Sequence, residues 1–320
     1  RWQCPAQPRG VVWYVLGPEC GAAVPYPRLT SALVENGFVV ALVHARGTGF
    51  SPGVRGDVGD YNAYLGDYGN FGVEIQRRFP GLPVFLLGHS VGAALAAHVA
   101  ATGTLPLAGV VLVNAAYRLR PAHGMTPTWR QYAAFAANLF FRPSAPVVDM
   151  NSQASAVPFG PDRAEAVAMQ HDPLVVRYFS MRMLLAQKRL MDRLPEHVAA
   201  LHVPVLVVQG AHDALVDPAG NDVLLARAAV SGSARLVVPD GGHGSSAVET
   251  AVEPFVRWFQ ERLASGADAG GVARQLAARQ ENGGRRMPIN LRRVLTAGLT
   301  AGLVISLSAL TVVPVVGDQM

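Results

Sequence analysis

A serine between two glycines at positions 88 to 92 could act as a nucleophile. The five residues read Gly-His-Ser-Val-Gly and follow an apolar run at 84–87 that predicts a strand buried on both faces. The Ala-rich run at 93–101 predicts a helix. A strand, a tight Gly-x-Ser-x-Gly turn and a helix would present the hydroxyl of Ser90 at the carboxyl edge of a sheet. This context favours a nucleophile over a surface serine in a glycine-rich turn.

A serine hydroxyl needs a base to take its proton, and the base needs a carboxylate to orient it. The strand-like run at 205–208 leads into Asp213 and Asp217, and the run at 236–238 leads into a glycine-rich loop that holds His243. We therefore predict a catalytic triad of Ser90, Asp213 and His243, with Asp217 as the alternative acid. Of the nine histidines, only His243 follows the last predicted strand, and the side chain of His89 should point away from Ser90.

The elements that must position these residues alternate along the chain. Strand-like runs at 11–16, 39–44, 84–87, 110–113, 205–208 and 236–238 alternate with helix-like patterns at 28–36, 67–79, 90–101, 219–230 and 248–263. This order predicts an α/β fold with a doubly wound, mostly parallel sheet covered on both faces. Ligands of such sheets bind at the carboxyl ends of the strands, where the candidate residues fall.

The stretch from about 120 to 200 interrupts this alternation, because it has no strand-like run and is rich in aromatic residues. We predict a helical lid inserted between two strands, lining an apolar pocket. Trp129, Tyr132 and Phe135 are its candidate substrate-binding residues. The alternative is that these aromatics are ordinary core residues.

Composition excludes some classes of function. The net charge is +5, but residues 265–320 hold six Arg against three acidic residues, which leaves +2 for residues 1–264. The main body therefore has no basic face for nucleic acid. Cys4 and Cys20 lack metal-ligand spacing and are expected to be free thiols, with a disulfide as the alternative. No metal or cofactor is predicted.

The C-terminal part differs from the predicted catalytic domain of residues 1–263. Residues 264–293 have the composition of a linker and end in a basic flank, and residues 294–316 contain no charge. These 23 residues would span about 34 Å as a helix, enough to cross a bilayer core. We predict a transmembrane anchor, with residues 1–263 on the cytoplasmic side because of the arginine flank. A buried helix and a fused or processed segment are the alternatives.

Together these motifs resemble the α/β-hydrolase superfamily. The similarity covers about residues 11–263 and includes the pentapeptide 88–92, the acid loop 210–216, the Gly-His pair at 242–243 and the Arg-Gly-Thr-Gly-Phe-Ser-Pro-Gly run at 46–53. More narrowly, the chain resembles the monoacylglycerol lipase and lysophospholipase group, also called serine aminopeptidase S33-like. The resemblance implies a serine esterase or lipase that acts on acylglycerols or lysophospholipids.

Two positions depart from the family pattern. The family usually has a His-Gly pair after an early strand, near one amide of the oxyanion hole, where this chain has Gly17-Pro18-Glu19. Because proline has no N–H, the donor would be the amide of Glu19 or a neighbour, together with the amide of Val91. His44 replaces an aspartate that often precedes the Arg-Gly-x-Gly turn.

Two alternatives to ester hydrolysis remain open at this stage. The same triad could hydrolyse amides or peptides or transfer acyl groups, and a lid carboxylate could then hold a free amine. Four carboxylates are available, and the sequence does not choose among them: Asp149, Asp162, Glu165 and Asp172. The second alternative is a binding module that retains the fold but has little activity.

Overall fold

A computed structural model describes residues 2–18, 25–120, 136–149 and 160–265. Glu19, the aromatic residues Trp129, Tyr132 and Phe135, and the predicted anchor at 294–316 lie outside the described residues. Among the helices of the described ranges, none is both long enough and apolar enough to cross a membrane.

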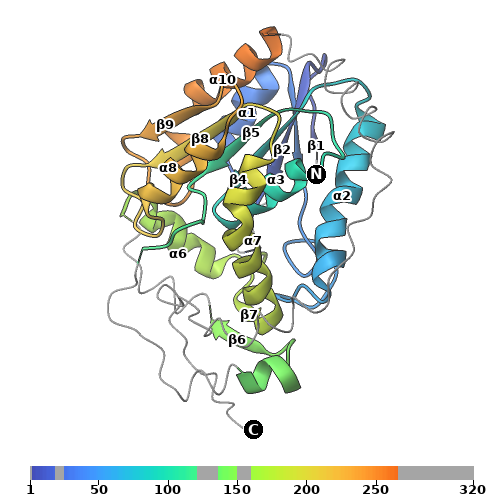
Figure 1. Cartoon of the computed structure of the whole chain (residues 1–320), viewed down its shortest axis with the longest axis vertical. Coiled ribbons are helices and arrows are strands. Elements are labelled where there is room, and N and C mark those ends of the chain that lie inside the picture. The colour runs from blue at the N-terminus through green and yellow to red at the C-terminus, as the bar shows by residue number, and fades with distance from the viewer. Residues whose placement is uncertain (1, 19–24, 121–135, 150–159, 266–320) are drawn as a thin grey trace.

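A seven-stranded sheet forms the centre of the molecule (Figure 1). Its strands lie in the order β1-β3-β2-β4-β5-β8-β9, and all neighbours are parallel except β1, which pairs antiparallel with β3. The bounds are Trp2–Gln3 for β1, Gly10–Val15 for β2, Phe38–Leu42 for β3, Val84–His89 for β4, Leu107–Val113 for β5, Val205–Gly210 for β8 and Ala234–Val238 for β9. The predicted doubly wound, mostly parallel sheet is confirmed.

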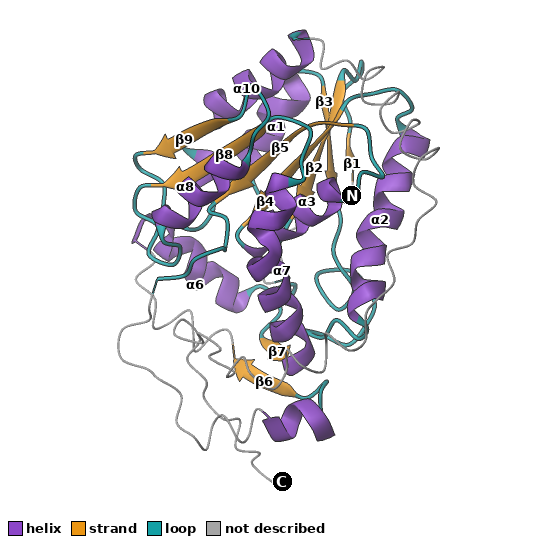
Figure 2. Cartoon of the chain, viewed as in Figure 1, coloured by secondary structure: helices purple, strands orange, loops and turns teal. Residues whose placement is uncertain are grey.

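Helices cover both faces of this sheet, as its fully buried inner strands require (Figure 2). One face packs against α2 (Tyr61–Arg78), α3 (Val91–Ala101), α7 (Met181–Ala199) and α8 (Pro218–Arg227). The other packs against α1 (Pro27–Glu35), α9 (Ser246–Glu249) and α10 (Val252–Ala264). Alternate residues of each strand face opposite clusters: Trp13 lies in the first and Tyr14 in the second. These two layers hold the strand ends in fixed positions.

The insertion between β5 and β8 is not wholly helical. It contains η1 (Gly160–Asp162), α6 (Arg163–His171) and the long α7, which begins where the hydroxyl of Ser180 accepts the N–H of Met183. It also contains an antiparallel pair of strands, β6 (Pro146–Asp149) and β7 (Tyr178–Ser180). The prediction that residues 120–200 hold no strand was therefore wrong. Both strands are too short, at four and three residues, to show a periodic pattern.

Candidate active site

Ser90 lies in the sharp turn between β4 and α3 with a strained backbone, at φ 55° and ψ −121°. Its N–H donates to the carbonyl of Val113 at 3.0 Å. A Cβ on Gly88 would lie 2.5 Å from the carbonyl oxygen of Gly92, and a Cβ on Gly92 would lie 2.2 Å from that of Val15. Both contacts are with backbone atoms, so neither position accepts a side chain. The two glycines therefore make the turn possible.

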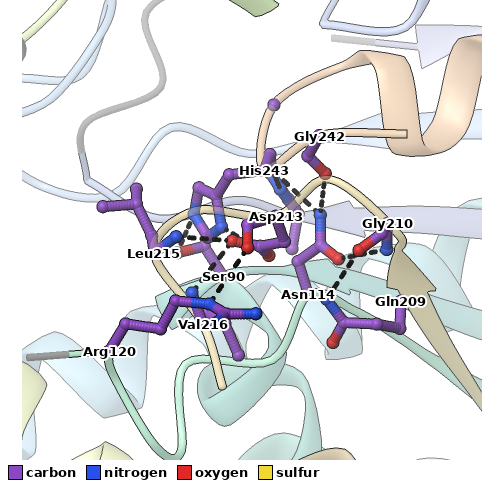
Figure 3. Close-up of polar contacts among 12 residues, drawn as sticks. Ser90, Asn114, Arg120, Gln209, Gly210, Asp213, Leu215, Val216, Gly242 and His243 are labelled. Atoms are coloured by element: carbon purple, nitrogen blue, oxygen red, sulfur yellow. Dashed lines mark hydrogen bonds and ion pairs between the residues drawn. The ribbon is translucent and has the colours of Figure 1, made fainter. Parts of the chain in front are cut away.

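The structure brings Ser90, His243 and Asp213 together at the carboxyl ends of three strands (Figure 3). His243 Nε2 lies 3.1 Å from Ser90 Oγ, and His243 Nδ1 lies 2.9 Å from Asp213 Oδ2. With the proton on Nδ1 donated to the carboxylate, Nε2 is free to accept the serine proton. These two hydrogen bonds are the ones that the predicted triad of nucleophile, base and orienting acid requires.

Asp213 is almost completely buried and is held by its own loop. Its Oδ1 accepts the N–H groups of Leu215 and Val216 at 2.8 and 2.9 Å. Burial raises the pKa of Asp213, but the hydrogen bonds from His243 and from these amides outweigh it, so the pKa lies below its ordinary value. The carboxylate is therefore charged at neutral pH. The alternative acid, Asp217, instead accepts the N–H of Ala219 at the start of α8.

Asn114 connects the acid strand to the histidine loop, and sequence reasoning missed it. Its Oδ1 accepts the N–H of Gly210 at 2.8 Å, while its Nδ2 donates to the carbonyls of Gly242 and His243 at 2.8 and 3.0 Å (Figure 3). It is fully buried, and its φ of 43° is in the left-handed region. A polar residue directly after the apolar strand β5 was the signal that could have found it.

His89 lies beneath the base. Its Nε2 donates to the carbonyl of His243 at 2.5 Å, and the two rings are 5.4 Å apart. Burial and the neighbouring His243 lower the pKa of His89 to about 4, so the ring is neutral at neutral pH. His89 therefore contacts the backbone of the base.

One predicted oxyanion donor lies in the described part of the site. Val91 is the first residue of α3, and the first N–H groups of a helix have no partner within the helix. The close contact of Gly92 with residues 15–17 brings the end of β2 beside this amide. The region of the second predicted donor, Glu19, is outside the described residues.

The four carboxylates considered for binding an amine have partners within the chain. Asp149 pairs with Arg177 at 3.2 Å, and Asp172 accepts the N–H of Leu174. Asp162 and Glu165 accept hydrogen bonds from the loop that follows His243. These contacts disfavour a role for any of them as an amine-binding group.

The nucleophile turn, the acid loop and the histidine loop at the carboxyl edge of a parallel sheet define the α/β-hydrolase class of protein. Within that class, the profile of the serine aminopeptidase S33 family matches residues 6–247. The chain belongs to this family.

Monoacylglycerol lipases are among the proteins that this chain resembles. Human monoglyceride lipase is 33% identical over 184 residues, which cover 56% of this chain and 57% of the human protein. The alignment therefore leaves out over two fifths of the human protein. The monoacylglycerol lipase of Mycolicibacterium smegmatis is 29% identical over 230 residues, covering 71% of this chain and 79% of that protein.

Solved structures share the fold. The monoacylglycerol lipase of Paleococcus ferrophilus has a TM-score of 0.65 at 22% identity, covering 83% of this chain and 98% of that one. A soluble variant of the Saccharomyces cerevisiae monoglyceride lipase has a TM-score of 0.67 at 20% identity, covering 82% and 91%. These likenesses support the α/β-hydrolase architecture.

Proposed function

We propose that this chain is a serine hydrolase that cleaves carboxylic esters of lipid-like substrates such as monoacylglycerol or lysophospholipid. The observation that carries the proposal is the hydrogen-bonded series from Ser90 Oγ through the His243 ring to Asp213 Oδ2, at 3.1 and 2.9 Å. The named activity of the relatives supports the same reaction.

In the first half of the proposed reaction, Ser90 Oγ attacks the ester carbonyl while His243 Nε2 takes its proton. The charged Asp213 stabilises the imidazolium that forms. The amide of Val91, with a second amide near Glu19, binds the oxyanion of the tetrahedral intermediate. His243 then gives its proton to the leaving alcohol, and an acyl ester remains on Ser90.

In the second half, a water molecule gives a proton to His243 and attacks the acyl carbonyl. The tetrahedral intermediate collapses, the bond to Ser90 Oγ breaks, and His243 returns the proton to the serine. The products are a fatty acid and an alcohol, and the enzyme is regenerated.

Apolar side chains on the insertion support a lipid-like substrate. Phe140 and Phe141 expose 80% and 85% of their surface beside the partly exposed Leu139. Contiguous exposed apolar residues favour contact with an apolar ligand or surface. Trp129, Tyr132 and Phe135 remain candidate pocket residues.

Hydrolysis of graded esters tests the proposal. Wild-type protein should hydrolyse p-nitrophenyl esters and monoacylglycerols of medium or long chain, and S90A should lose about 10⁴-fold or more in kcat. Equal rates for the two proteins would contradict it. The p-nitroanilides of the same acids measure the amide alternative, and these should react far more slowly.

Membrane association through residues 294–316 stays a separate proposal, based on the uncharged sequence of this segment and its arginine flank. On this proposal residues 1–263 form the hydrolase domain, and residues 264–293 connect it to the anchor. Deleting residues 285–320 should move the protein from the membrane fraction to the soluble fraction. An unchanged distribution would contradict the anchor without affecting the hydrolase proposal.

A further inference from the structure

The loop of residues 242–246, here called the histidine loop, is bonded to the insertion as well as to the sheet. Asp162 Oδ2 accepts the N–H of Gly244 at 2.8 Å, and its Oδ1 accepts that of Ser246 at 2.9 Å. Glu165 Oε2 accepts both the N–H and the hydroxyl of Ser245, at 2.8 and 2.6 Å. Three successive backbone N–H groups directly after His243 therefore end on insertion carboxylates.

The carboxylate of Asp162 is buried, and its hydrogen bonds to the histidine loop are partly buried. Asp162 is only 3% exposed, and within the described residues no Arg or Lys forms an ion pair with it. A buried carboxylate is costly unless hydrogen bonds satisfy it, and here the bonds come from the histidine loop. Both oxygens of Asp162 are used in this way, so its position and that of the loop depend on each other.

The glycines beside His243 fit the same arrangement. A Cβ on Gly242 would lie 2.1 Å from Asp162 Oδ2, and a Cβ on Gly244 would lie 2.7 Å from Glu165 Oε2. Neither glycine has a positive φ, so the backbone conformation alone does not require glycine there. A side chain at either position would meet these carboxylates, which would have to move away from the histidine loop.

We propose that Asp162, assisted by Glu165, is a positioning residue for His243. It holds the histidine loop so that the ring stays in reach of Ser90, and it thereby makes activity depend on the placement of the insertion. This inference rests on the proposed hydrolase function, because it concerns the base of that reaction.

The test compares D162A and E165Q with D149N, a change to an insertion carboxylate that pairs with Arg177 instead. We expect D162A to lower kcat about 10- to 100-fold with little change in KM, because small misplacements of a catalytic group have effects of that size. E165Q should give a smaller loss, and D149N should stay within about twofold of wild type.

A second measurement does not depend on turnover. The Nδ1 proton of His243, held by Asp213, should give a far-downfield proton NMR signal that is present in wild type and D149N and lost or shifted in D162A. If the wild type has no esterase activity, the proposed function fails, while this signal still tests the positioning. Unchanged kcat and an unchanged signal in D162A would overturn the inference and leave the proposed function standing.

A double-mutant cycle separates positioning from general destabilisation. G242A should push the Asp162 carboxylate out and reproduce the kinetic defect of D162A, and the double variant should be no worse than G242A. If the loss of kcat in the double variant equals the product of the two single losses, the two changes act independently and the proposal is contradicted. If D162A does not fold, D162N replaces it in the cycle, since it retains one acceptor.

Discussion

The sheet and the insertion hold the histidine loop, residues 242–246, in different ways. On the sheet side, neutral donors from strand ends, Asn114 and His89, bind the carbonyl of His243. On the insertion side, the carboxylates of Asp162 and Glu165 bind the N–H groups that follow. The proposed base, His243, therefore lies between strand ends that belong to the core and carboxylates that belong to the insertion.

Substitutions on the two sides should therefore differ in how much they lower stability and how much they lower activity. Asn114 and His89 are buried at the ends of central strands, so changing them disturbs the core as well as the site. The insertion contacts come from η1 and α6, outside the central sheet; Asp162 on η1 is buried, but α6 has no buried residue. Changes at Asp162 should therefore affect the base more than the fold.

The largest effect should come from Asp213, on the sheet side. D213N keeps an acceptor for the loop amides but presents an NH₂ group to His243, which favours the wrong tautomer of the ring. We expect kcat to fall about 10⁴-fold while the free energy of unfolding changes little. Ester hydrolysis and urea unfolding measure the two. A loss of less than tenfold would contradict the role of Asp213 as the orienting acid.

Acid should destabilise the protein through His89. Its pKa is about 4 in the folded protein and 6.5 ordinarily, so the unfolded chain binds a proton first as the pH falls. Stability should decrease between pH 6.5 and 4, by up to about 3 kcal/mol from this group. His197, whose pKa burial also lowers to about 4, adds to the same trend.

Urea unfolding at several pH values checks this, with H89Q as the control, because glutamine keeps a donor for the carbonyl of His243 and does not titrate. The free energy of unfolding should decrease less steeply with falling pH in H89Q than in wild type. An equal slope would show that His89 is not a source of the acid sensitivity. Asp213, with its lowered pKa, loses its contribution only as the pH falls below about 4.

Changing Asn114 should have the smallest of these effects, but it should lower both the stability of the protein and its kcat. N114A leaves the N–H of Gly210 and the carbonyls of Gly242 and His243 without this partner, which should cost about 2 kcal/mol of stability. It should also lower kcat, whereas D162A should lower kcat with a smaller loss of stability. N114G removes the same bonds without strain at a φ of 43°, so it should be the more stable of the two. If N114A loses activity without losing stability, the proposed difference between the sheet side and the insertion side is contradicted.

The fold was predictable because buried parallel strands are continuous apolar runs. Each of the six predicted strands matches an observed strand within a few residues, and the helix predicted at 67–79 begins earlier, at Tyr61, where Asp60 caps it. The geometry among Ser90, Asp213 and His243 followed from the order of these strands, since parallel strands bring their carboxyl ends to one edge.

The contacts that hold the base were not predictable in the same way. Asn114, Asp162 and Glu165 act through hydrogen bonds to backbone groups 80 to 129 residues away, and no local pattern marks such partners. The short strands β6 and β7 depend on their pairing with each other, so propensity did not show them.

Labelling with a fluorophosphonate, which reacts only with an activated serine, tests the central claim most directly. Folded wild-type protein should take up one label per chain on the peptide that contains Ser90, and H243A should react about 10³-fold more slowly or not at all. A binding module without an activated serine would take up no label. Folded wild-type protein that stays unlabelled, or S90A that labels as fast as wild type, would contradict the account.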